Sequence, residues 1–139
     1  MKTGKFKNLL IKVLKEDNDV SKNVGSSKYI TKHWKVKVEN MDTLDSATFD
    51  YYGGSAVEFD ALSCLQCLLS DAEVVVQGDK GSYYRDNIDY LISEFGCQYK
   101  DAVDIARGCE KNYNKLSEII DNLDDVVFDY LNELSEMGY

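Results

Sequence analysis

The chain has 139 residues, of which 44% are hydrophobic and 29% are charged, as is ordinary for a soluble globular protein. This length predicts one domain with its own core, and no run approaches 18 consecutive apolar residues, so we expect no membrane span. The formal net charge of −9 is unevenly distributed: residues 1–40 have a net charge of +6, and residues 41–139 have −15. An acidic body of this kind repels nucleic acid and favours basic partners.

The first residues are basic, and the apolar run that follows them is short and interrupted by Lys12 and Lys15. Such a run does not fit a signal peptide, so we expect a cytoplasmic protein. Thiols stay reduced in the cytoplasm. The four cysteines therefore indicate buried thiols or metal ligands rather than disulfides.

The N-terminal part of the chain predicts a small antiparallel sheet. Residues 6–14 have apolar side chains at helical spacing, although the segment also tolerates a strand. Residues 17–27 are polar and predict a loop. Residues 28–38 alternate as a half-buried strand does, and after a turn at 40–46, residues 48–52 predict the partner strand of a hairpin.

The remainder of the chain predicts helices. Asp60 is a candidate N-cap for the first, Gly96 is a candidate C-cap for the second, and Asp101 is a candidate cap for the third. Apolar residues recur at three-and-four spacing over 116–134, which predicts one long last helix.

These elements predict an α+β fold: a small N-terminal antiparallel β-sheet or hairpin packed on a C-terminal bundle of about four helices. We expect a single domain over 1–139, basic and strand-rich in 1–55 and acidic and helical in 60–139.

The cysteines predict a structural zinc site. Cys64 and Cys67 are three residues apart, which places both thiols on one side of a helix, and Cys97 and Cys109 belong to the next two elements. Four thiolates suit tetrahedral zinc. Three alternatives stay open: the cysteines are buried thiols, His33 replaces one ligand, or Cys64 and Cys67 form a redox pair at a helix start.

Motifs of catalysis are missing from the sequence. A single histidine excludes a His-Glu-x-x-His zinc motif, and neither a phosphate-binding loop nor a Gly-x-Ser-x-Gly elbow is present. We therefore expect a protein that is not an enzyme.

A pattern of motifs resembles a family of small acidic proteins of phages and mobile elements, some of which are anti-CRISPRs. The pattern is a strand led by Trp, Phe-x-Tyr-Tyr-x-Gly, Leu-Leu-Ser-Asp-Ala ending a helix, Phe-Gly-x-x-Tyr and Ala-x-x-Cys. Its residues here are Trp34, Phe49, Tyr51, Tyr52, Gly54, Leu62, Leu65, Cys67, Leu68, Ser70, Asp71, Ala72, Phe95, Gly96, Ala106 and Cys109. Cys64 and Cys97 are not typical of the family. The resemblance implies a phage-encoded, non-enzymatic inhibitor of type II Cas9 that acts in the bacterial host cell.

Charge suggests how such an inhibitor binds. Cas9 holds nucleic acid in positively charged channels, so an acidic surface is suited to dock there and block loading of target DNA. The predicted partner-binding residues are Asp121, Asp125, Asp129, Glu133 and Glu136. We expect a monomer that contacts Cas9 or another basic nucleic-acid-binding protein, with no membrane contact and no direct DNA binding.

Two alternative functions remain. The first is a small phage regulatory or nucleic-acid-associated protein that reaches phosphates with its basic N-terminal arm, through Lys2, Lys5, Lys7, Lys12 and Lys15. The second is a thiol oxidoreductase, although Cys64 and Cys67 lack the Trp-Cys-Gly-Pro-like surroundings expected of one.

Overall fold

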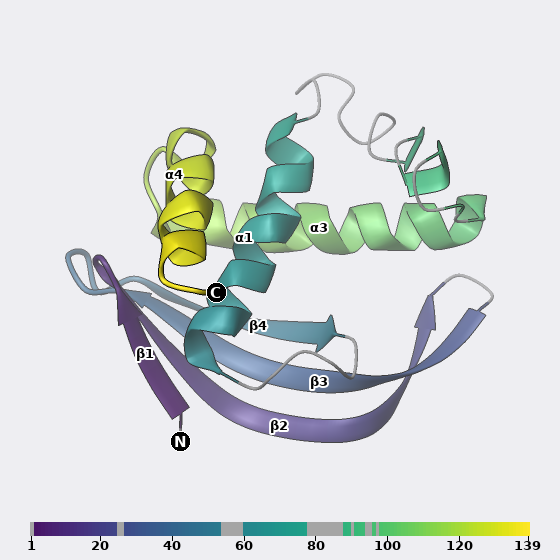
Figure 1. The fold of residues 1–139 in the computed structure, drawn as a ribbon, viewed down its shortest axis with the longest axis horizontal. Coiled ribbons are helices and arrows are strands. Elements are labelled where there is room, and N and C mark those ends of the chain that lie inside the picture. Colours follow the sequence, from purple (N-terminus) through teal and green to yellow (C-terminus); the bar gives the residue numbers. More distant parts are fainter. Residues whose placement is uncertain are drawn as a thin grey trace.

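The computed structural model describes residues 2–24, 27–53, 60–77, 88–89, 91–93, 96 and 98–139. Four antiparallel strands lie side by side in chain order: β1 (Lys2–Phe6), β2 (Leu9–Val24), β3 (Ser27–Asn40) and β4 (Ser46–Gly53). The main helices are α1 (Ala61–Gln77), α3 (Tyr99–Ile119) and α4 (Leu123–Glu136). Figure 1 shows the curved sheet with these helices gathered on one of its faces. The predicted α+β class is confirmed.

Alternation along the strands decides which face of the sheet is buried. Leu9, Ile11 and Val13 of β2 point inward, and Trp34 and the valines that follow it do so in β3. The side chains between them point to the opposite face, because successive residues of a strand project to opposite sides. Helix α1 packs on the inner face and shares one hydrophobic core with the sheet and α4.

The helical interpretation of residues 6–14 is wrong, and so is the loop predicted at 17–27. Phe6 pairs with Leu9 across a tight turn, and β2 continues to Val24 against β3. The inward residues of β2 have a period of two, which the spacing of Leu9, Leu10, Val13 and Leu14 concealed. Register shifts at residues 13–15 and 17–20 let this polar strand stay paired despite its length.

Two of the predicted helix caps are confirmed. The Ser63 backbone N–H donates to Asp60 Oδ2 at 3.2 Å, which caps α1. Gly96 has a φ of +66° and its N–H donates to the Ile92 carbonyl, as a C-capping glycine does. Residues 88–89 and 91–93 of the predicted second helix are helical.

The other two helix boundaries need correction. Helix α3 starts at Tyr99 with Gln98 as its N-cap, so Asp101 lies in the first turn and is buried rather than capping. The predicted long helix over 116–134 is broken: α3 ends at Ile119, and Asn122 takes a left-handed φ of +55° before α4 begins. The apolar stripe runs through the break because both helices pack on the same core.

Asn40 joins three parts of the fold at the end of β3. Asn40 is 5% exposed, and its Nδ2 donates to the Ile119 carbonyl at 2.8 Å. Its Oδ1 accepts from the backbone N–H groups of Asp42 and Thr43 and from the side chain of Asn8. One amide therefore fixes the β3–β4 turn, the β1–β2 turn and the end of α3.

None of the helices within the described part of the chain has the length and apolar character needed to cross a membrane.

Candidate functional site

Four of the five predicted partner-binding carboxylates lie exposed at the C-terminal end of the fold. Asp125, Asp129 and Glu136 project from α4. Asp121 is exposed in the turn that precedes it, not on the helix itself. Residues three and four apart share one side of a helix, so Asp125 and Asp129 are neighbours. We call Asp121, Asp125, Asp129 and Glu136 the α4 acidic face.

Glu133, the fifth predicted residue, has an intramolecular partner. Lys7 Nζ lies 2.9 Å from Glu133 Oε1, and the same ammonium sits 4.8 Å from the centre of the Tyr130 ring. The hydrogen bond to Glu133 raises the pKa of Lys7, so the lysine stays charged. Glu133 therefore holds the β1–β2 turn against α4. Unlike the carboxylates of the α4 acidic face, it already has an ion-pair partner among the described residues.

Phe128 is a candidate binding residue that sequence reasoning missed. It lies between Asp125 and Asp129 on α4, and 38% of it is exposed. Large aromatics surrounded by polar groups often anchor protein interfaces. The sequence did contain a sign of this residue. Phe128 is a large apolar residue outside the apolar stripe that continues through Val127 and Leu131, so helical periodicity places it on the exposed side.

We predict that Phe128→Ala will speed dissociation from a protein partner more than it slows association. The ring carries no charge, so it does not steer the encounter, but it contributes contact area once docked. Surface plasmon resonance separates the two rates. Leu44→Ala is the matched control, because Leu44 is 74% exposed and lies in the β3–β4 turn. Equal dissociation rates for both variants would remove Phe128 from the interface.

The predicted basic arm is not an arm, because its lysines belong to β1, β2 and the turn between them. Three are engaged: Lys2 with Glu16 at 3.2 Å, Lys7 with Glu133, and Lys15 with Asp17 at 3.5 Å. Lys5 and Lys12 make no ion pair with any residue that the structure describes, and both lie on the outer side of the sheet.

Three of the four predicted zinc ligands are described, and all three are free thiols. Cys64 and Cys67 lie on α1, and Cys109 lies on α3, where its thiol donates to Asp71 Oδ1 at 3.7 Å. Cys97 lies outside the described residues. Within the described ranges, no three His, Cys, Asp or Glu side chains come together as a metal site. These three thiols alone therefore do not form a zinc site.

The zinc ion stays a prediction with a direct test. Elemental analysis of protein purified without added metal should find about one zinc per chain, because structural zinc binds tightly enough to survive purification. Cys64→Ser or Cys67→Ser should then lose the metal and lower the melting temperature. Ser70→Ala, at an exposed position of the same helix, is the control. Metal-free protein of unchanged stability would leave only buried thiols.

The structure also bears on two of the alternatives, His33 as a zinc ligand and Cys64 with Cys67 as a redox pair. His33 lies on the outer side of the sheet, with Nδ1 3.2 Å from Asp17 Oδ2 and Nε2 3.0 Å from Asp50 Oδ1. The sheet thus separates it from the thiols of α1. A redox cysteine needs a lowered pKa. Burial instead raises the pKa of Cys64 to about 12 and also raises that of Cys67.

A polar cluster lies between α1 and α3, around Asp71. Asn112 Nδ2 donates to Asp71 Oδ2 at 3.0 Å, and Cys109 donates to the other oxygen. Burial raises the pKa of Asp71 to about 6, although both hydrogen bonds favour the charged form. Burial also raises the pKa of Tyr51, and the nearby Asp71 carboxylate adds to that effect.

This environment predicts how stability depends on pH. The folded-state pKa of Asp71 lies above its unfolded value. Its contribution to the free energy of unfolding is therefore fully present below about pH 4 and is lost as the pH rises through 6. As the pH rises from 4 to 7, the difference in unfolding free energy between Asp71→Asn and the wild type should therefore shift by about 1–3 kcal/mol in favour of the variant. Urea denaturation measures this, with Asp125→Asn as an exposed control. Parallel pH profiles for wild type and Asp71→Asn would contradict it.

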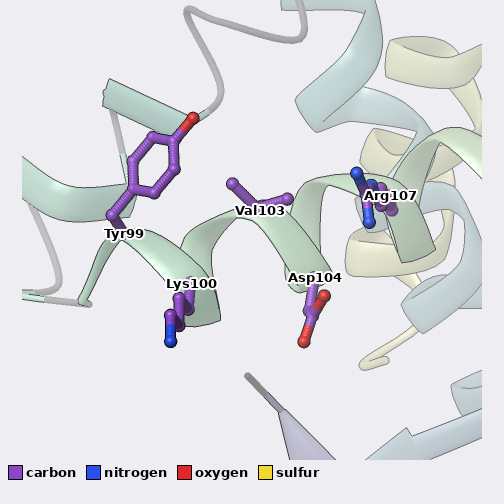
Figure 2. Close-up of a pocket in the computed structure, with 5 residues that line it drawn as sticks. All are labelled: Tyr99, Lys100, Val103, Asp104 and Arg107. Atoms are coloured by element: carbon purple, nitrogen blue, oxygen red, sulfur yellow. The ribbon is translucent and has the colours of Figure 1, made fainter. Parts of the chain in front are cut away.

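A shallow pocket lies beside the first half of α3. It has a volume of about 280 Å³ and is lined by Tyr99, Lys100, Val103, Asp104 and Arg107. Figure 2 shows that these side chains leave the helix in several directions, with Tyr99 and Val103 on one side and Lys100 and Asp104 on another. None of them was predicted as a site residue.

No protein-family model and no curated protein sequence matches this chain. Only the chain's own surfaces therefore bear on its function. Among those predicted from the sequence, the α4 acidic face is the one whose residues lie exposed close together in the fold.

Proposed function

We propose that this protein is a non-enzymatic inhibitor that docks its α4 acidic face on a basic nucleic-acid-binding protein, with Cas9 as the specific candidate. The observation that carries the proposal is the set of exposed carboxylates on and before α4. Asp121, Asp125, Asp129 and Glu136 make no ion pair with any described residue. Their charge is therefore available to a partner.

The structural setting of this face suits recognition of a positively charged surface. The opposite side of α4 is buried in the core through Leu123, Val127, Tyr130 and Leu134. The helix therefore presents its carboxylates from a fixed position. A preorganised face loses little conformational entropy on binding. Phe128 adds an exposed apolar side chain beside these charges.

Cas9 is the candidate partner for two reasons. It holds nucleic acid in positively charged channels, where a rigid row of carboxylates competes with phosphates. The motifs from Trp34 to Cys109 also resemble a family that includes anti-CRISPR proteins. Docking in a channel would exclude target DNA without any covalent chemistry.

The test is retention of purified Cas9 on the immobilised protein at low salt, with and without guide RNA. We expect retention, and we expect the complex to lose binding of target DNA in a mobility-shift assay. Retention that leaves DNA binding intact would refute inhibition of loading. Absence of retention in both forms would remove Cas9 as the partner. Bovine serum albumin, an acidic protein, is the control for non-specific charge.

A further inference from the structure

The outer face of the sheet is the second charged surface of the molecule. The helices cover only the inner face, as Figure 1 shows. Alternation places the side chains of Lys5, Lys12, Lys35 and Lys37 on the outer face, since Phe6, Ile11, Val13, Trp34, Val36 and Val38 point inward. We call these four residues the sheet lysine cluster. They come from three strands and from both sides of the β2–β3 hairpin.

The register brings these lysines together. Lys12 and Lys37 are direct partners across β2 and β3, and Lys35 follows two residues along the same face. Lys5 pairs with Leu10, two residues from Lys12. Adjacent strands lie about 4.8 Å apart and residues i and i+2 about 7 Å apart, so the cluster is dense. Like charges placed directly opposite destabilise a sheet, and a bound anion would relieve that repulsion.

The acidic residues near this cluster have other partners or lie beside it without an ion pair among the described residues. Asp50 lies directly opposite Lys35 across β3 and β4, but its carboxylate contacts His33 Nε2, and the Asp17 carboxylate contacts His33 Nδ1. Asp17 also pairs with Lys15. Glu39 lies further along β3, opposite Leu10 and Ser46. No member of the sheet lysine cluster forms an ion pair with the residues described in the structure.

An aromatic pair continues the same face beyond Lys35. Tyr52 pairs with His33 across β3 and β4, and their rings stack at 4.8 Å with an angle of 27°. Proteins that bind single-stranded nucleic acid combine lysines or arginines that follow the backbone with aromatic rings on which bases stack. An acidic polypeptide would satisfy the lysines but has no comparable use for the rings.

We propose that the outer face of the sheet binds single-stranded nucleic acid, with the sheet lysine cluster on the phosphates and the Tyr52–His33 pair beside a base. The expectation of no direct DNA binding came from the net charge of the whole chain. The proposal depends on local charge, and on a surface that the fold separates from the α4 acidic face.

The test uses the protein alone, without Cas9, and a fluorescent single-stranded oligothymidylate in an anisotropy titration at low salt. We expect saturable binding whose logarithmic salt slope is about −3 if four phosphates are contacted. Lys12→Glu with Lys37→Glu should weaken binding at least tenfold and reduce the slope by about 1–2. Lys100→Glu with Lys111→Glu makes the same charge change on exposed positions of α3 and should leave both values unchanged.

Two further measurements separate nucleic acid from other anions. Tyr52→Leu should weaken binding roughly 5- to 100-fold through lost stacking. Polyglutamate should compete poorly with the oligonucleotide. Equal loss in the two lysine double variants, or equal competition by polyglutamate, would overturn the proposal. Circular dichroism checks that each variant is folded. Failure here would leave the Cas9 retention experiment unaffected, because that experiment depends on α4.

Discussion

Reversing Asp121, Asp125 and Asp129 together to lysine is expected to slow association with Cas9, the proposed partner, by about tenfold or more at low salt. The three carboxylates are exposed, and charges at the rim of an interface act mainly on the rate of encounter. The difference between variant and wild type should shrink as salt rises, because screening shortens to about 8 Å at physiological ionic strength. Stopped-flow or surface plasmon resonance rates over a salt series measure this.

A matched control separates the position of the charges from their number. Replacing Glu39, Asp45 and Glu110 with lysine changes the net charge by the same amount, but these acids lie in β3, before β4 and on α3. We expect a much smaller change in the association rate. Similar slowing in both triple variants would mean that only the overall charge matters. No slowing in either would make the α4 acidic face a solubility feature.

Asn40→Ala should lower the free energy of unfolding by about 2–4 kcal/mol, as expected when a buried hydrogen-bond network is broken. The change leaves the Ile119 carbonyl and the backbone N–H groups of Asp42 and Thr43 without their partner. It also loosens the end of α3, immediately before the turn that carries Asp121. Urea denaturation measures the loss of stability.

Two further variants separate the loss of the Asn40 hydrogen bonds from the effect of an Asn→Ala change in general. Asn132→Ala makes the same substitution at an exposed position of α4 and should be close to neutral. Asn40→Asp keeps the acceptor oxygen but loses the Nδ2 donor to Ile119, so it tests that one hydrogen bond together with the burial of a charge. A loss below about 1 kcal/mol for Asn40→Ala would show that water replaces the amide.

The sequence predicted the fold where local pattern and tertiary packing agree. Residues 28–38 alternate because one side meets the core, and Asp60 caps a helix through a contact three residues away. Prediction failed where tertiary contacts decide. Residues 9–14 have apolar side chains that suit either period, and only pairing with β1 and β3 selects the strand. The break at Asn122 leaves the apolar stripe intact, so periodicity did not show it.

For the candidate surfaces too, the features set by local sequence were predicted and those set by tertiary contacts were not. Exposed acids at helical spacing were visible in the sequence, so most of the α4 acidic face was predicted. The pairing of Glu133 with Lys7 was not, because it joins opposite ends of the chain. The sheet lysine cluster depends on the register of β2 against β3, where a shift of one residue would turn Lys37 into the core.

The contact between the first hairpin and α4 has a consequence for biosynthesis. Phe6 meets Tyr130 edge to face at 5.5 Å, and Lys7 binds Glu133, so the first hairpin is completed by a helix that is synthesised after the rest of the described core. Until α4 leaves the ribosome, the inner surface around Phe6 and Leu9 lacks part of its cover. A nascent or shortened chain lacking residues beyond Ile119 is therefore expected to expose apolar surface and to depend on chaperones or aggregate.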